Sequence, residues 1–437
     1  MLPGDARRRL GIVLLAVLWT LPPALWAVRR RSPPRRATPA RPAGHEPRRK
    51  PDAGAAPGLP LVAFDGQARS PSVPSDAAAL SPLLDVAPPP HPDSGLRGVT
   101  VGRAAAVSPG LSFFFSPAPP PAKAFLIDRN GKVVWRWSIE LDPGDEESRP
   151  RVEDVELLPD GSVLCVLRDR AVLKLDRDSR RVWECRVRAH HDLWPDSSGD
   201  IEALTHERRI VREIHSTIPI ESDAIAVLTR DGRVKDSIPL LDVFRRSGYD
   251  YLLPRLQGAL LDPKTGALDV FRVDHVESLD GSLAARSPIY AKGNLLFSLG
   301  NLDVIGIIDV RTRRIVWLWG PGNLGHPNDA RMLPNGHVLI FDGGVDRSQV
   351  IEIEPLSQTV VWRYAAPKTF PSSVAGTAQR LSNGNTLITE SAKGCAVEVT
   401  RSGETVWEYG TGENDTGPGG IVRMTRVDPA RLTFLPK

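Results

Sequence analysis

Cysteine is scarce in this chain of 437 residues, which has only Cys165, Cys185 and Cys395 and no CxxC pair. This scarcity excludes a disulfide-rich scaffold and leaves no cysteine-based zinc motif. Aromatic residues are also few, at 6%. Hydrophobic residues nevertheless reach 41%, which is enough for a sizeable core. We therefore expect a folded protein, organised as two or three average domains or as one large repeat domain.

Charge is unevenly distributed along the chain. The formal net charge is +4, yet residues 1–50 carry 12 Lys and Arg side chains against two acidic ones, so the remainder is net acidic. The basic character thus belongs to an amino-terminal arm. A mildly acidic globular part disfavours a nucleic-acid-binding domain, and we expect no nucleic-acid partner.

The amino terminus predicts a membrane segment followed by a tether. Residues 10–28 are uncharged and lie between two groups of three arginines, a length just sufficient to cross a bilayer as a helix. We expect residues 1–28 to be an uncleaved signal anchor, with a cleaved signal peptide as the alternative. Residues 29–95 are rich in Pro, Arg and Ala, which predicts an extended, disordered tether.

A repeat dominates the rest of the chain. A strand, a turn and a second strand that mostly contains Trp are legible six times, beginning near residues 124, 172, 225, 305, 350 and 396. Trp317, Trp362 and Trp407 follow one another at intervals of 45 residues. Five of the copies are preceded by a further hairpin with an Asn-Gly, Asp-Gly or similar turn. Four short strands in each period of about 45 residues are typical of propeller blades.

We therefore predict an all-β fold, a six-bladed β-propeller over residues 96–437. The blade with its outer hairpin at residues 124–137 lacks inner strands, for which residues 421–432 are the obvious donor, so that strands from both chain ends close the ring. The Trp residues are interpreted as packing between blades. One helical turn is expected near residues 240–247.

The innermost strand of each blade places its first residues at one end of the ring. Counting back from the glycine of each following turn gives the predicted inner ring, with His190 beside it, and Arg272 and His326 two residues upstream on the same strand faces. Imidazole, guanidinium, carboxylate and carboxamide groups gathered in one funnel favour binding or catalysis. The ring residues are Glu153, His191, Asp274, Asn328 and Gly376.

The chain resembles the bacterial arylsulfate sulfotransferases from about residue 98 to residue 427. The resemblance is carried by GLSFFFS, LIDRNGKVVWRW, AHHDLWPD, LTHERRIVREIHSTIPIESD and LDGSLAARSPIYAKGNLLFSLGN. It implies a six-bladed propeller that moves a sulfuryl group from an aryl sulfate to a phenol through a histidine intermediate, without a metal or other cofactor. It also favours export, and we expect a membrane-anchored or exported propeller in the periplasm. The excess of Arg after residue 28 favours the alternative, a cytoplasmic body.

The motifs match only in part. His190-His191-Asp192 is intact, but Arg272-Val273-Asp274 stands where the family tends to show His-x-Asn, and the Arg expected near Gly300 is missing. The nucleophilic His of the family aligns with Asn328. We therefore predict His326, His191 and Arg272 as catalytic residues. The predicted substrate-binding residues are Asn328, Asp274, His190 and Glu153, and no metal ligand is predicted.

Three interpretations stay open: a sulfotransferase with a shifted nucleophile, a site that has drifted to another ligand such as a cation held by oxygen ligands, and a non-catalytic, membrane-tethered binding module. The expected partners are an aryl sulfate, a phenolic acceptor and the membrane, and a homodimer is left open. His206 and His215 fall in LTHERRIVREIH, which we interpret as loop structure.

Overall fold

The computed structural model describes residues 98–101, 103–117, 121–141, 151–253, 259, 261–262, 265–344, 348–365, 376–410 and 420–436. The predicted anchor and tether lie outside these residues. Among the described residues, no helix has the length and apolar character to cross a bilayer.

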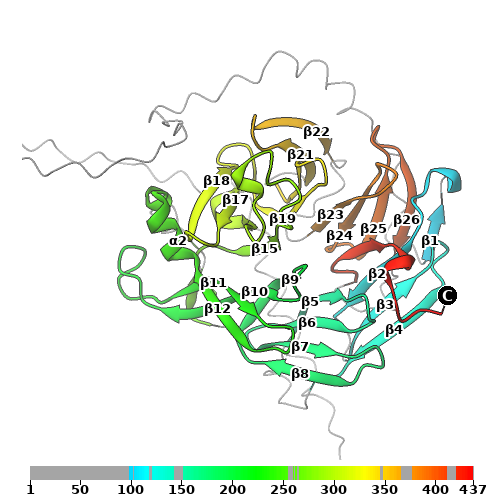
Figure 1. Cartoon of the computed structure of the whole chain (residues 1–437), viewed down its shortest axis with the longest axis horizontal. Coiled ribbons are helices and arrows are strands. Elements are labelled where there is room, and N and C mark those ends of the chain that lie inside the picture. Colours follow the sequence, from blue (N-terminus) through cyan, green and yellow to red (C-terminus); the bar gives the residue numbers. More distant parts are fainter. Residues whose placement is uncertain are drawn as a thin grey trace, which may run out of the picture. The chain divides into compact units, whose positions relative to one another are not determined.

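Six sheets are arranged as the blades of a β-propeller, as predicted (Figure 1). Blade 1 contains β27 (Met424–Val427), β2 (Leu111–Ser116), β3 (Ala122–Ile127) and β4 (Val133–Ile139). Blade 2 contains β5 (Val152–Leu157), β6 (Val163–Leu167), β7 (Ala171–Leu175) and β8 (Arg181–Cys185). Blade 3 contains β9 (Ala189–Pro195), β10 (Ile201–Arg209), β11 (Ile220–Leu228) and β12 (Val234–Pro239).

The remaining blades follow in chain order. Blade 4 contains β15 (Val273–Ser278), β16 (Leu295–Leu299), β17 (Val304–Asp309) and β18 (Arg314–Trp319). Blade 5 contains β19 (Pro327–Met332), β20 (Val338–Asp342), β21 (Gln349–Glu354) and β22 (Thr359–Ala365). Blade 6 contains β23 (Gly376–Arg380), β24 (Thr386–Glu390), β25 (Cys395–Val399) and β26 (Thr405–Gly410). In Figure 1, β5, β9, β15, β19 and β23 lie nearest the centre of the ring.

The ring closes in blade 1, where the carboxyl-terminal β27 pairs with β2 in antiparallel fashion, from Leu111 opposite Val427 to Phe114 opposite Met424. The prediction of closure by strands from the two ends is confirmed. The tail supplies only the innermost strand, however, because residues 111–116 before the outer hairpin supply the second one.

Three smaller features complete the fold. The expected helical turn is α2 (Leu240–Ser247), whose Leu240, Leu241, Val243 and Phe244 are buried. β1 (Gly98–Val101) adds a fifth strand to blade 6. β13 (Leu261–Asp262) and β14 (Ala267–Asp269) extend blade 3 beyond β11 and were not predicted.

The core lies between the blades rather than within one central mass. The described residues contain six clusters of buried apolar side chains, and each cluster joins two neighbouring blades. Ile307 of blade 4, for example, belongs to the same cluster as Ile351 of blade 5. Both faces of each sheet carry apolar side chains, and each face packs against a neighbouring blade. The middle strands are therefore buried along almost their whole length.

The repeated Trp residues form hydrogen bonds from one blade to the next. In five of the six blades a Trp on the fourth strand from the axis donates through Nε1 to a carbonyl in the outer turn of the following blade, at 2.9–3.2 Å. These pairs are Trp135 with Arg177, Trp183 with Arg230, Trp317 with Pro355, Trp362 with Arg401 and Trp407 with Arg129.

Blade 3 lacks this Trp, and a reversed contact takes its place. Arg313, in the outer turn of blade 4, donates to the Ser237 carbonyl and to both carboxylate oxygens of Asp236 on β12, at 2.7–2.9 Å. The predicted role of the Trp residues in packing between blades is thus accompanied by a directional polar contact at each blade junction.

Trp407→Phe should lower the free energy of unfolding by about 1–3 kcal/mol, because it leaves the Arg129 carbonyl without its donor. Urea denaturation would measure the loss. Trp135→Phe removes the same type of bond at an exposed position and should cost less. Equal stability of both variants and the unmutated chain would contradict a structural role for these bonds.

Candidate functional site

β-bulges place the predicted ring residues at one end of the propeller. The pairing of β5 with β6 shifts between Val152 and Asp154, and equivalent shifts occur in β15 and β19, so that one residue in each strand is left unpaired. In β9 the shift opposite residues 203–205 spans residues 190–192. Bulges re-aim side chains and are frequent beside active sites. The residues at the bulges are Glu153, His191, Asp274 and Asn328.

We call this end of the ring, where the inner strands begin, the mouth. The fifth predicted ring position, Gly376, contributes no side chain there. An added Cβ would lie 2.2 Å from the ring of Phe341, which fills the space.

Three of the predicted residues have left-handed backbone conformations. The φ angles are 51° for His191, 49° for Arg272 and 63° for His326. Non-glycine residues reach this region at an energetic cost, and such strain is concentrated at functional sites. All three predicted catalytic residues therefore occupy strained positions at the start of an inner strand.

Glu153 links blade 2 to blade 3. Its carboxylate accepts hydrogen bonds from Arg168 Nη1 at 2.7 Å and from the backbone N–H of His191 at 2.9 Å. Burial opposes ionisation of Glu153, but His191 and Arg168 outweigh it and lower its pKa to about 2. Glu153 is therefore a permanent anion that fixes the start of β9.

His191 lies between a second imidazole and a carboxyl group. Its Nδ1 is 2.8 Å from Nδ1 of His190, and its Nε2 is 3.6 Å from Asp274 Oδ1. Burial lowers the pKa of His191 to about 4, so its ring is neutral at pH 7. Burial also disfavours a charged His190, but the nearby Asp223 carboxylate, 3.3 Å from His190 Nε2, raises the pKa of His190 overall. The two adjacent imidazoles thus differ in basicity.

Asp274 stands between His191 and Arg272. Its side chain is 8% exposed, and Oδ2 lies 3.8 Å from Arg272 Nε but makes no hydrogen bond to any described residue. Burial raises the pKa of Asp274 to about 8, in spite of the opposing charge of Arg272. At neutral pH this residue is mainly a carboxylic acid, which can donate a proton.

His326 and Asn328 complete the mouth from blade 5. The backbone N–H of His326 donates to Asp303 at 2.9 Å, while its ring Nδ1 is buried and makes no hydrogen bond to any described residue. Burial, with a further effect of Arg272, lowers the pKa of His326. The Nδ2 amide of Asn328 is buried and likewise makes no hydrogen bond within the described part of the chain.

Gly300 shows why these side chains can meet. A Cβ at this position would lie 2.6 Å from Cε1 of His326 and 3.1 Å from Oδ2 of Asp274. The glycine therefore makes room for both side chains. The Arg that the family resemblance leads one to expect near residue 300 would compete for the space that His326 occupies.

A second ring of charged groups lies directly after the bulges and faces the neighbouring blades. Asp192 Oδ2 is 2.7 Å from His275 Nδ1 and accepts the backbone N–H of Val276, and His275 Nδ1 is 3.4 Å from Asp329 Oδ1. Asp329 also accepts the backbone N–H of Ala378 at 3.1 Å. These contacts connect β9, β15, β19 and β23. Asp192 therefore orients His275 rather than His191.

Arg423, just before β27, completes this second ring and was missed in the sequence. Its guanidinium is 7% exposed and donates to Asp154, Glu156 and Asp192, the first and last at 3.0 and 3.1 Å. A lone Arg in a tail carries no sequence signal of this kind, because its three carboxylate partners lie about 230–270 residues away in the chain.

One further expectation from the sequence is corrected by the structure. His206 is not in a loop: it lies on β10, is buried, and stacks on His190 with 4.8 Å between ring centroids. The alternation of apolar and polar residues along β10 was the available signal. Whether Cys165 and Cys185 pair was left open by the sequence; in the structure Cys165, Cys185 and Cys395 are all free thiols.

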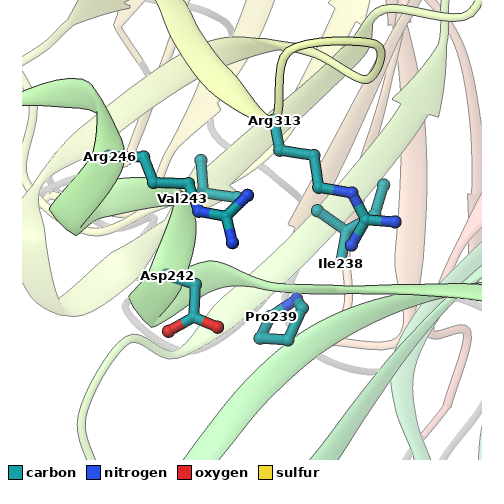
Figure 2. Close-up of a pocket in the computed structure, with 6 residues that line it drawn as sticks. All are labelled: Ile238, Pro239, Asp242, Val243, Arg246 and Arg313. Carbon is teal, nitrogen blue, oxygen red and sulfur yellow. The ribbon is translucent and has the colours of Figure 1, made fainter.

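One small cavity lies away from the mouth. Figure 2 shows it beside α2, where its volume is about 20 Å³. This is room for about one water molecule, so the cavity does not hold a substrate. Its lining residues are Ile238, Pro239, Asp242, Val243, Arg246 and Arg313.

Comparison with known proteins gives one family match. A family model described as Arylsulfotransferase (ASST) matches residues 101–410, well over half of the chain. No curated protein matches the chain.

Several solved structures are similar at low identity. A protein of unknown function from Bacteroides caccae has 15% identity and a TM-score of 0.46, covering 72% of this chain and 98% of its own. A functionally unknown protein from Desulfotomaculum acetoxidans has 12% identity and a TM-score of 0.42, and the match covers 73% of this chain and 100% of that protein. Virginiamycin B lyase from Staphylococcus aureus has 14% identity and a TM-score of 0.37, and the match covers 62% of this chain and 72% of the lyase.

Arg423→Met should lower the free energy of unfolding by about 3–5 kcal/mol, because the buried carboxylates of Asp154 and Asp192 and the partly exposed one of Glu156 would lose their shared cation. Denaturant unfolding of this variant, beside an Arg431→Met control at an exposed position, would measure the difference. A loss no larger than that of the control would show that the second ring does not stabilise the fold.

Proposed function

The chain belongs to the arylsulfotransferase family, and from this premise we propose that it transfers a sulfuryl group from an aryl sulfate to a phenolic acceptor through a histidine at the mouth. The observation that carries the proposal is a group of buried polar atoms there that make no hydrogen bond to any described residue. Such atoms are costly unless a ligand completes them. They are Arg272 Nε, Asp274 Oδ2, His326 Nδ1 and Asn328 Nδ2.

His326 is the proposed nucleophile. Its lowered pKa keeps the imidazole neutral at pH 7, so that a nitrogen lone pair is available for attack on sulfur. Because Nδ1 of His326 makes no hydrogen bond to a described residue, no protein group has to be displaced before this nitrogen attacks. The bond from sulfur to the aryl oxygen then breaks, and its electron pair leaves with the phenolate.

Arg272 and Asn328 are proposed to bind the sulfuryl oxygens. Guanidinium and amide N–H groups are donors suited to oxygens on which negative charge accumulates. Both side chains have a buried nitrogen without a hydrogen bond, and they approach the mouth from blades 4 and 5. Arg272 would thereby take over the function of the Arg that is missing near Gly300.

Asp274 is proposed to move the proton in both half-reactions. In its protonated form it protonates the departing phenolate. The resulting carboxylate then accepts the proton of the acceptor phenol while that oxygen attacks sulfur. The nitrogen–sulfur bond breaks, its electron pair returns to His326, and both residues regain their starting states.

One observation favours a binding module without turnover. Asn328 occupies the position at which the family resemblance places the nucleophile, and a carboxamide is not a useful nucleophile. The donors at the mouth would then hold an anionic ligand without cleaving it. The two functions differ in whether a covalent sulfohistidine forms.

His326→Ala should abolish transfer from nitrophenyl sulfate to phenol by the full chain. It should also abolish the mass gain of one SO3 group that the unmutated chain shows with the donor alone. His191→Ala should retain the mass gain, and His215→Ala, outside the mouth, should behave as the unmutated chain. A mass gain lost only in His191→Ala would move the nucleophile to that residue. No mass gain in the unmutated chain with several aryl sulfates would support the binding module.

The rate of transfer should depend on the protonation of Asp274. Because burial raises its pKa to about 8, the acid form is present below that pH and is lost as the pH rises through it. We therefore expect kcat/KM for the donor to fall above about pH 8. Asp274→Asn should remove this alkaline limb and lower the rate most for donors with poor phenolate leaving groups. An alkaline limb that persists in the variant would exclude Asp274 as its origin.

A further inference from the structure

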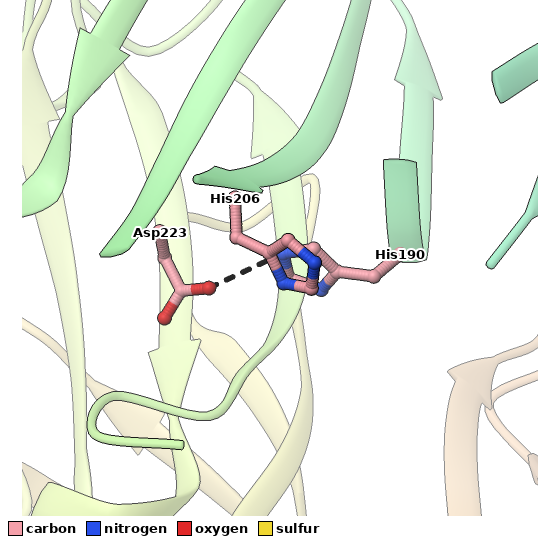
Figure 3. A group of neighbouring side chains, drawn as sticks. All are labelled: His190, His206 and Asp223. Carbon is pink, nitrogen blue, oxygen red and sulfur yellow. Dashed lines mark ion pairs between the residues drawn. The ribbon is translucent and has the colours of Figure 1, made fainter. Parts of the chain in front are cut away.

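A second cluster of ligating side chains lies behind the mouth, within blade 3. His190 comes from β9, His206 from β10, and Glu221 and Asp223 from β11. His206 and Asp223 are paired across the two strands, and Glu221 is two residues from Asp223 and thus on the same face. Figure 3 shows the rings of His190 and His206 overlapping, with the Asp223 carboxylate directed toward His190.

The spacing of these atoms suits a metal ion. His190 Nε2 is 3.3 Å from Asp223 Oδ1, close to the separation of about 3.3–3.5 Å expected for two ligands of one tetrahedral Zn²⁺. Ligand atoms of His190, His206 and Asp223 all lie within 4.8 Å of one another. Glu221 Oε2 lies 3.8 Å from His206 Nδ1 and offers a fourth ligand.

The cluster is buried and incompletely hydrogen-bonded. His190, His206, Glu221 and Asp223 are all at most 8% exposed. His190 Nε2, Asp223 Oδ2 and Glu221 Oε1 make no hydrogen bond within the described part of the chain. Two imidazoles and two carboxylates without full hydrogen bonding in a dry interior are expensive to bury, and a cation would satisfy them.

Each histidine is held through its other nitrogen, as metal-ligating histidines usually are. His206 Nε2 contacts Asp169 Oδ1, and Arg188 Nη2 lies 3.2 Å from the same nitrogen. These contacts leave Nδ1 of His206 for an ion. His190 Nδ1 contacts His191 Nδ1, which leaves Nε2 for the ion. The outer contacts therefore specify which nitrogen of each ring faces the cluster.

We propose that His190, His206 and Asp223, with Glu221, bind a divalent first-row transition-metal ion, and that Zn²⁺ fits this set of nitrogen and oxygen ligands. The two carboxylates neutralise the charge of the ion. With Nε2 of His190 on the metal, Nδ1 of the same ring lies 2.8 Å from Nδ1 of His191, which connects the ion to the mouth.

The test is a titration of the chelator-treated full chain with Zn²⁺, followed by elemental analysis and thermal unfolding. We expect one ion per chain and a rise in Tm with Zn²⁺ concentration. His206→Ala should abolish this binding, and Asp169→Asn should weaken it about 10–100-fold because only the outer contact is lost. His215→Ala, in the same blade but outside the cluster, should bind as the unmutated chain does.

A spectroscopic measurement on the unmutated chain tests for the metal site even if a variant fails to fold. Co²⁺ bound to the unmutated chain should give the intense visible absorption bands of a tetrahedral nitrogen and oxygen site, displaced by Zn²⁺. Absence of stoichiometric Zn²⁺ and of these bands would overturn the proposal. Unchanged binding in a folded His206→Ala variant would do the same, because the ion would then lie elsewhere. Neither result depends on sulfuryl transfer, so this proposal and the proposed function fail separately.

Discussion

Innermost strands of neighbouring blades share no backbone ladder, so side chains must hold them around the axis. A continuous series of contacts does this. Arg423 joins the start of β27 to β5 and β9, and Asp192, His275 and Asp329 carry the connection through β15 and β19 to β23. Gln379 and Arg426 exchange hydrogen bonds between β23 and β27 and close the circle. The position of every residue at the mouth depends on this circle.

Consecutive residues of each inner strand face different ways, so the same strand contributes to the stability of the ring and to the candidate site. At each bulge one residue is directed to the mouth, and the next residue turns into the contacts between blades. In β9 this assigns His191 to the mouth and Asp192 to His275 and Arg423. The carboxylates of the second ring are matched by Arg423, His275 and backbone N–H groups, although His275 Nε2 makes no hydrogen bond within the described residues, whereas four buried polar atoms at the mouth have no such bond. A ligand at the mouth therefore completes missing hydrogen bonds, while the contacts of the second ring already hold the surrounding strands in place.

Several parts of this arrangement could be read from the chain in advance. The Trp period, the turn glycines and the alternating strands predicted the six blades, and registration on those glycines identified Glu153, His191, Asp274 and Asn328 as the starts of the inner strands. The cluster of His190 with His206 and Asp223 could not be predicted in this way, because it depends on how far β10 and β11 extend beside β9. Arg423 was equally invisible, since its carboxylate partners come from other blades.

The periodic hydrophobic pattern of the chain suffices to predict the number of blades, because strand pairing within most blades is local and repeats. The closing strand was predicted instead from the one blade that lacked inner strands, since β27 pairs with β2 from the other end of the fold. Tertiary structure alone decided which ionisable groups meet, since those contacts run between blades and across strand ends. It placed His326 and Asp274 in the space that Gly300 leaves open and turned Asp192 away from His191. Burial then set the proton affinities of these groups, because the charged form of a side chain loses its hydration only when the surrounding blades have assembled.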